Sequence, residues 1–148
     1  MNLNGLLLEK LQEALGSNAD AIRFFKTWCE YIHEIDDLID ETERPTPEAI
    51  IRSHVNAASL YSSNFWHRNG DRLYPIVLQI ANEYADSVRW ENTEDWRQHF
   101  ADVLSSCGNN MLMMIVGITA GWDKLREISE LIREESYAQH HNEIGDKV

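Results

Sequence analysis

The sequence predicts an all-α protein, a single-domain bundle of five or six helices. Apolar residues recur three and four positions apart along nearly the whole chain, and no segment shows the sustained alternation of a strand. The chain has 148 residues, of which 43% are hydrophobic, so it is long enough for one globular core. We assign the bundle to residues 1–137 and expect residues 138–148, which lack an apolar rhythm, to form a polar, frayed tail.

Two helices are expected before the first proline. The first is an amphipathic segment that stops at Gly16, a residue type favoured just after a helix end. The second begins at an N-cap within residues 17–20 and extends to about Thr42. Its apolar seam consists of Phe25, Trp28, Ile32, Ile35 and Ile39.

The third helix has a clear start signal. Thr46 is a capping hydroxyl before Pro47 and Glu48, a combination typical of a helix N-terminus. An Asn-Gly-Asp turn at residues 69–71 is expected to separate this helix from a fourth one, which holds Pro75 in its first turn, where a missing N–H matters little. The inner face of the third helix is expected to comprise Ile51, Val55, Ala58 and Phe65.

The last third of the chain predicts a fifth and a sixth helix. The fifth opens at residues 93–95 and carries one apolar stripe from Trp96 to Ile118. Gly117 and Gly121 indicate a kink or a break before the sixth helix. Three tryptophans lie on these apolar stripes and are expected in the core, namely Trp28, Trp96 and Trp122.

The charge of the chain narrows the function classes. Lys and Arg number 13 against 25 Asp and Glu, which gives a net charge of −12. Such a surface repels phosphate backbones and anionic lipids, so we expect no nucleic-acid partner and no membrane. Cations and basic protein partners are favoured instead.

Cysteine usage and the N-terminus favour a cytoplasmic location. Cys29 and Cys107 lie in apolar helical stretches without a CxxC spacing, which is typical of reduced cysteines that pack in a core. The first residues lack the basic start and the apolar run of a signal peptide. The longest apolar run, residues 111–122, is too short to span a bilayer and predicts a buried helix.

The acidic segment from Glu30 to Glu41 contains most of the candidate functional residues. At about 100° per residue, Cys29, His33, Asp36 and Asp40 share one shoulder of the apolar seam. Hard oxygen ligands on one rigid face suit Mg²⁺ or Mn²⁺. The candidate metal ligands are Asp36, Asp40, His33, His54, Asp37 and Glu34. A solvated acidic face is the alternative interpretation, and the sequence leaves it open.

Two candidate residues lie on other helices. His54 falls near the centre of the expected apolar face of the third helix, where a histidine is either a metal ligand or a neutral core residue bonded to an acceptor. Glu83 flanks the seam of the fourth helix and is the candidate catalytic acid or base.

Residues 36–40 read Asp-Asp-Leu-Ile-Asp, which resembles the first aspartate-rich helix of class I isoprenoid diphosphate synthases. In that family the motif binds magnesium ions that hold the substrate diphosphate, so the resemblance implies metal contacts for Asp36 and Asp40. Residues 34–37, Glu-Ile-Asp-Asp, also resemble the Glu-x-x-Asp helix of all-α nucleoside triphosphate pyrophosphohydrolases, which are small acidic bundles that oligomerise. The sequence departs from both families. It has no second aspartate-rich helix, and Glu9 and Glu13 of the preceding helix are four apart rather than three.

Two functions of different classes stay open. The first is a divalent-metal-dependent hydrolase of a nucleotide or another diphosphate, with Mg²⁺ or Mn²⁺ as cofactor and a phosphorylated small molecule as substrate. The second is a non-enzymatic acidic helical interaction module that binds a basic protein partner. The sequence does not decide whether the protein is an enzyme. The Met-rich run at residues 111–114 is either core packing or a buried oligomer face, and the sequence leaves a homo-oligomer open.

Overall fold

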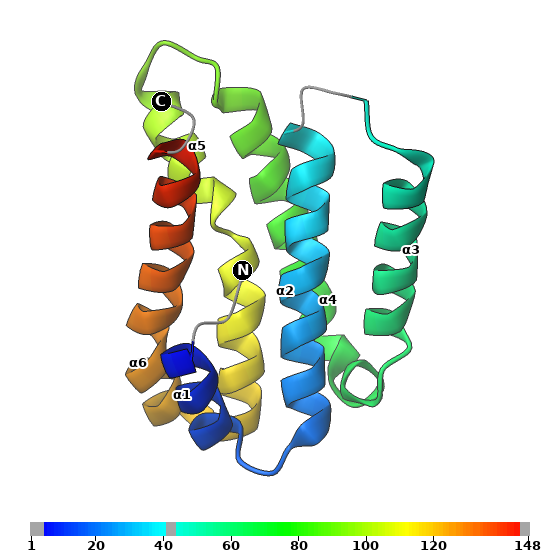
Figure 1. The fold of residues 1–148 in the computed structure, drawn as a ribbon. Coiled ribbons are helices and arrows are strands. Elements are labelled where there is room, and N and C mark those ends of the chain that lie inside the picture. Colours follow the sequence, from blue (N-terminus) through cyan, green and yellow to red (C-terminus); the bar gives the residue numbers. More distant parts are fainter. Residues whose placement is uncertain (1–4, 41–43, 146–148) are drawn as a thin grey trace.

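The computed structural model describes the backbone of residues 5–40 and 44–145, and the side chains of these residues except 40 and 137–145. Within these residues it contains six helices and no strand (Figure 1), which confirms the predicted all-α bundle. The helices are α1 (Gly5–Leu15), α2 (Ala19–Asp40), α3 (Pro47–Tyr61), α4 (Asn64–Trp90), α5 (Trp96–Ser105) and α6 (Gly108–Gly145).

The last helix, α6, is a hairpin of two arms. Gly121 adopts φ 85° and ψ −178°, a conformation outside the helical region that is open to glycine. Residues on either side of it meet: a Cβ on Gly117 would lie 3.5 Å from Leu125 Cδ2, and Arg133 Nη2 lies 3.6 Å from Met113 Sδ. In Figure 1 the arm before Gly121 is yellow, and the arm after it runs back beside it from orange to red. The predicted break at Gly121 is confirmed.

The hydrophobic core lies where α1, α2, α4 and α6 meet. The central helix α2 contacts α3, α4 and α6, and α1 lies against α6 and α2. Phe24, Phe25 and Trp28 of α2 are each at most 2% exposed. The other large buried side chains include Leu7, Leu60, Phe65, Leu73, Met111, Ile115 and Ile132. Burial of such side chains, worth about 1.5–3 kcal/mol each, is the main force that holds the helices together.

Side-chain caps fix the starts of α2 and α3. Thr46 caps α3 as predicted, with its Oγ1 accepting a hydrogen bond from Ala49 N at 3.2 Å. At the start of α2, Asn18 Oδ1 accepts from Ala21 N at 3.0 Å. These bonds satisfy backbone N–H groups that have no partner within the helix.

The sequence-based boundary between the third and fourth helices is wrong. α3 ends at Tyr61, and α4 runs straight through the expected turn at residues 69–71. Ser63 caps α4 instead, because its Oγ accepts from Trp66 N at 3.2 Å. Pro75 lies inside α4 on its exposed side, where water can bond the carbonyl that the missing N–H leaves free.

The expected fifth helix is divided in two. α5 ends at Ser105 and α6 begins at Gly108, so the stripe across residues 96–118 is not continuous. The break lies against α2, where Trp28 Nε1 donates a hydrogen bond to the Gly108 carbonyl at 3.1 Å. A Cβ on Gly108 would lie only 3.0 Å from Ile32 Cγ2, so glycine permits this close approach.

Two of the three tryptophans expected in the core are at the surface. Trp28 is buried as predicted, whereas Trp96 and Trp122 are 62% and 70% exposed. α5 buries Ala101 and leaves a second face open to solvent. We call this face the α5 stripe; it consists of Trp96, Phe100 and Val103.

The third helix, α3, also presents its apolar stripe to solvent. Ile51 and Val55 are 63% and 57% exposed. His54 is exposed as well, so the expected inward orientation of this face is wrong. The buried residues of α3 are Ser53 and Leu60. α3 lies mainly against α2, and the period of a helix identifies its apolar stripe without showing which face a neighbour covers.

Among the residues that the structure describes, no single helix is long and apolar enough to cross a membrane, although the bent pair Trp96–Ser105 and Gly108–Ser136 meets that test by its combined length and composition. The backbone of α6 is helical through Gly145, and the fraying of residues 138–148 stays a prediction.

Candidate functional site

A groove of about 590 Å³ opens between α2, the end of α4, α5 and both arms of α6. Its volume falls within the range of roughly 300–1,000 Å³ that is typical of ligand pockets. Four helices contribute to its walls, and the second arm of α6 reaches the groove because the hairpin at Gly121 turns the chain back along the first arm. We refer to it below as the acidic groove.

The floor of the acidic groove is apolar. It includes Trp28 and Ile32 of α2, Val88 of α4 and Leu112 of α6. The hydrogen bond from the Trp28 indole to the Gly108 carbonyl fixes the ring across the junction between α2 and α6. A fixed apolar surface of this kind can take an apolar side chain without first having to become ordered.

Carboxylates outnumber basic groups in the lining of the acidic groove. Its lining includes Asp36, Glu91, Asp102 and Glu134, against one guanidinium, that of Arg133. These acids come from α2, from the residue after α4, from α5 and from the second arm of α6. Low-dielectric walls strengthen the field of like charges around a cleft, so the groove attracts cations more strongly than the average surface does.

The carboxylate of Asp36 is held in place by α4. The hydroxyl of Tyr84 donates a hydrogen bond to Asp36 Oδ1. Both residues line the acidic groove, and this bond therefore ties the wall formed by α2 to the wall formed by α4.

Asn109 is a buried polar residue in the lining of the same groove. It is only 7% exposed, and within the part of the chain that the structure describes its side-chain amide makes no hydrogen bond. The neighbouring Asn110 differs, because its Nδ2 donates to Glu83 Oε2 at 3.3 Å. The amide of Asn109 is thus a donor and an acceptor that the groove leaves for water or a ligand.

The candidate metal ligands of α2 bond to different neighbouring residues. Glu34 Oε2 accepts from Asn56 Nδ2 of α3 at 2.7 Å, whereas Asp36 faces Tyr84. His33 and Asp37 form an exposed pair, with 3.7 Å between Nε2 and Oδ2. In the described residues no group of three or more His, Cys, Asp or Glu side chains is arranged to hold a metal ion.

The other candidates lie apart from this group. The side chain of Asp40 lies outside the described residues. His54 is exposed on α3. Glu83, the candidate acid or base, accepts hydrogen bonds from Gln79 Nε2 at 2.7 Å and from Asn110 Nδ2 at 3.3 Å. Binding of Mg²⁺ or Mn²⁺ and catalysis by Glu83 therefore stay predictions.

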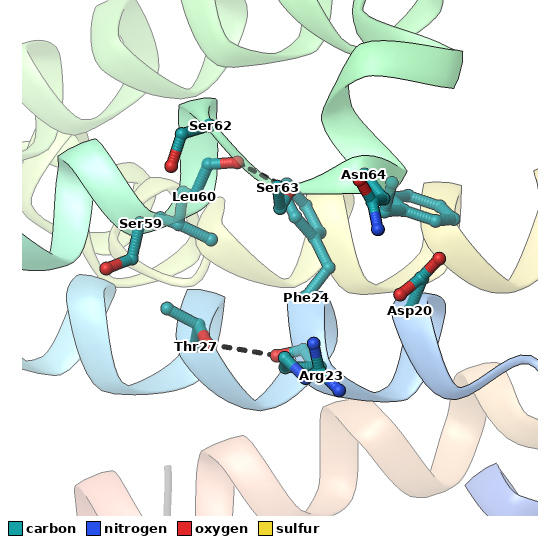
Figure 2. Close-up of a pocket in the computed structure, with 10 residues that line it drawn as sticks. Asp20, Arg23, Phe24, Thr27, Ser59, Leu60, Ser62, Ser63 and Asn64 are labelled. Atoms are coloured by element: carbon teal, nitrogen blue, oxygen red, sulfur yellow. Dashed lines mark hydrogen bonds between the residues drawn. The ribbon is translucent and has the colours of Figure 1, made fainter.

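A smaller cavity of about 260 Å³ lies between α2 and the junction of α3 and α4 (Figure 2). Its lining is rich in hydroxyl groups, but the helices use two of them. Ser63 Oγ donates to the Leu60 carbonyl at 2.7 Å, and Thr27 Oγ1 donates to the Arg23 carbonyl at 3.0 Å. These groups cap or close helical turns, so the acidic groove is the stronger candidate site.

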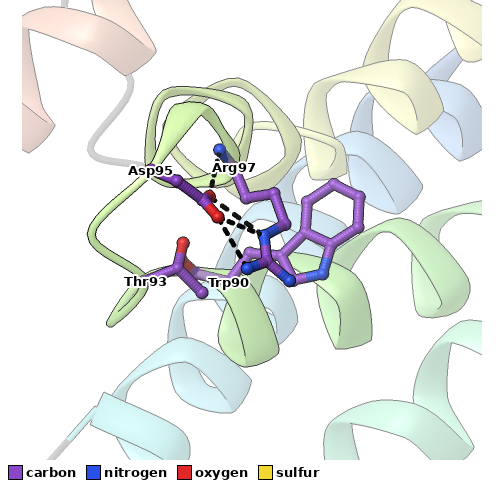
Figure 3. Close-up of polar contacts among 4 residues, drawn as sticks. All are labelled: Trp90, Thr93, Asp95 and Arg97. Atoms are coloured by element: carbon purple, nitrogen blue, oxygen red, sulfur yellow. Dashed lines mark hydrogen bonds and ion pairs between the residues drawn. The ribbon is translucent and has the colours of Figure 1, made fainter.

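Polar contacts between residues 90 and 97 lie at the start of α5, the helix that forms one wall of the acidic groove (Figure 3). Asp95 caps α5, and its carboxylate binds the Arg97 side chain with 2.6 Å between Oδ2 and Nη2. Hydrogen bonds from Arg97 lower the pKa of Asp95 to about 2. Thr93 Oγ1 donates to the Trp90 carbonyl at 2.7 Å and closes the preceding turn.

The two cysteines are free and buried, as the sequence predicts for core residues. Burial raises the pKa of Cys29 to about 12 and that of Cys107 to about 11, so both thiols are protonated near neutral pH. We expect 5,5′-dithiobis(2-nitrobenzoate) to label the native protein on the order of a hundredfold more slowly than the urea-unfolded protein. Rapid labelling of native Cys29 in a Cys107→Ser background would contradict the buried position.

Sequence reasoning missed most of the acidic groove. It placed Cys29, His33 and Asp36 on one side of α2, but it did not identify Asn109, Tyr84 or the second arm of α6 as parts of the same site. For these missed parts, the one signal in the sequence was the polar pair Asn109 and Asn110 at the start of an apolar run.

Comparison with protein-family models, with curated proteins and with solved structures found no match to this chain.

Proposed function

We propose that this protein is a non-enzymatic interaction module that holds a basic, amphipathic segment of a partner protein in the acidic groove. The observation that carries this proposal is the combination, in one groove, of an apolar floor with four carboxylates and a single guanidinium. The net charge of −12 supports it, because at low ionic strength such a charge speeds the encounter with a cationic partner.

The surface next to the groove extends the same chemistry. Val103 belongs both to the groove lining and to the α5 stripe, which leaves Trp96 and Phe100 62% and 54% exposed. Exposed aromatic residues are enriched at binding surfaces. A helical segment with one apolar face could bury that face on the α5 stripe and in the groove while its cationic face meets the carboxylates.

The hydrolase interpretation has less support. The acids of α2 are divided between Asn56, Tyr84 and His33, which lie on α3, α4 and α2. A metal centre for diphosphate chemistry needs several oxygen ligands within bonding distance of one ion.

The direct test is calorimetric binding of a synthetic amphipathic helical peptide with leucine on one face and lysine on the other. We expect binding that weakens as salt is raised, and no binding of the matched peptide with glutamate in place of lysine. The groove variant Glu91→Gln/Asp102→Asn/Glu134→Gln is expected to bind the basic peptide about tenfold more weakly, because each rim pair contributes about 0.2–1 kcal/mol.

A control variant removes the same number of charges away from the groove, namely Glu48→Gln/Asp71→Asn/Asp123→Asn. At about 0.15 M salt the Debye length is about 8 Å, so these distant charges are screened and affinity should stay within about twofold. Equal weakening in both triple variants would show that the peptide binds the overall charge rather than the groove, and would refute the proposed site.

Titration with Mg²⁺ or Mn²⁺ alone tests the hydrolase interpretation. Heat of binding that disappears in an Asp36→Asn/Asp40→Asn variant would favour the metal site over the interaction module. Unchanged heats in wild type and variant would remove that site.

A further inference from the structure

The unbonded amide of Asn109 identifies an anchor position in the acidic groove. The residue is 7% exposed and lines the groove, and its side-chain amide makes no hydrogen bond inside the described part of the protein. It follows Gly108, whose Cα lies so close to α2 that a Cβ there would meet Ile32 at 3.0 Å. Asn109 therefore directly follows a point of close contact between α6 and α2.

A carboxylate lies on the facing wall. Asp36 is one helical turn beyond Ile32 and lines the same groove. Its Oδ1 accepts from the Tyr84 hydroxyl, and Oδ2 makes no hydrogen bond with any described residue. The groove thus offers an incoming donor two acceptors from two helices, the carboxylate of Asp36 and the amide oxygen of Asn109.

We infer that the anchor of the bound segment is an arginine side chain whose guanidinium bonds Asp36 and Asn109 together. This inference rests on the function proposed above and names the residue type that the groove selects. The guanidinium carries five donors in a planar fork, so it can bond more than one acceptor at once. Its methylene stem would lie on the apolar floor, on Ile32 and Leu112.

Lysine fits this position less well than arginine. Its ammonium is a compact point charge that loses more hydration on burial and offers no fixed fork. The protein's own Arg133 lines the groove, but its Nη2 lies 3.6 Å from Met113 Sδ, and no described acid pairs with it. In the described structure Arg133 bonds neither Asp36 nor Asn109, so their acceptors are open to a guanidinium from outside.

The test uses the lysine-rich amphipathic peptide with arginine, lysine or citrulline at its central polar position. On the wild-type protein we expect the arginine peptide to bind on the order of tenfold more tightly than the other two, the difference that hydrogen bonds to charged groups make. In Asn109→Ala the advantage of arginine over lysine should fall to about twofold. Asn110→Ala is the matched control, because that amide faces Glu83 outside the groove, and it should keep the tenfold advantage.

Equal binding of the arginine and lysine peptides to the wild-type protein would overturn this inference and leave the interaction module standing. No binding of any basic peptide would overturn the proposed function itself. Thermal melting of Asn109→Ala checks that the variant is folded. Should it fail to fold, the three-peptide comparison on the wild-type protein decides alone.

Discussion

Replacement of Trp28 by alanine is expected to destabilise the folded protein by about 3–5 kcal/mol, the usual cost of truncating a large aromatic side chain in a core. Trp28 is 2% exposed, and its ring contacts Tyr31 with 5.9 Å between centroids. Its indole N–H also donates to the Gly108 carbonyl, so the variant loses a hydrogen bond as well as packing. Urea denaturation followed by circular dichroism measures the change in the free energy of unfolding.

Two other tryptophan variants separate the contribution of packing from that of the hydrogen bond. Trp28→Phe keeps most of the apolar volume but leaves the Gly108 carbonyl without its donor, so we expect a loss of about 1–3 kcal/mol. Trp122→Ala removes a side chain that is 70% exposed and should change stability by about 0.5 kcal/mol or less. A loss at Trp122 as large as that at Trp28 would mean that the assignment of inside and outside is wrong.

The sequence predicts the helices of this protein better than it predicts their faces. Local signals suffice for a helix start such as Thr46 and for the break at Gly121, because capping bonds and glycine conformations depend on neighbouring residues only. The burial of a face depends on which helix covers it. Ile51 and Val55 form an apolar stripe on α3, but α2 covers the side of Ser53 and Leu60 instead.

The two helix boundaries that the sequence predicts wrongly lie at residues 69–71 and 105–107. The Asn-Gly-Asp residues at 69–71 favour a turn, yet they lie within α4, where Phe65 and Leu73 on either side are buried in the core. Burial of two large side chains outweighs a turn preference of about 1 kcal/mol per residue. Residues 105–110, Ser-Ser-Cys-Gly-Asn-Asn, are rich in turn-forming residues, and the apolar stripe on either side of them hides this signal for a break.

Only the part of the candidate site that lies on a single helix was predictable from the sequence. The acids of α2 share one helix, and the spacing correctly places Asp36 beside the apolar seam, where it lines the groove. The separation of Glu34 from Asp36 depends on two partners distant in sequence, Asn56 and Tyr84. The groove itself requires the second arm of α6 to run back along the first, so that residues within 133–136 line the same groove as α2, a tertiary arrangement that no single-helix pattern encodes.

The return of that second arm depends on Gly121, and Gly121→Ala is expected to destabilise the protein by about 1–3 kcal/mol. Its φ of 85° with ψ of −178° is a conformation that only glycine adopts without strain. The space around it is open, because no residue other than its chain neighbours has a heavy atom within 4 Å of the position that a Cβ would take. Any loss of stability would therefore come from the backbone alone.

The matched control is Gly117→Ala. Its helical Cβ meets only Leu125 Cδ2 at an ordinary 3.5 Å, so this variant should be neutral or stabilising by up to about 1 kcal/mol. Urea denaturation of both variants gives the comparison. Because the second arm carries Arg133 and Glu134 into the groove, Gly121→Ala should also weaken binding of the basic peptide, whereas equal stability of the two variants would show that the turn does not need glycine.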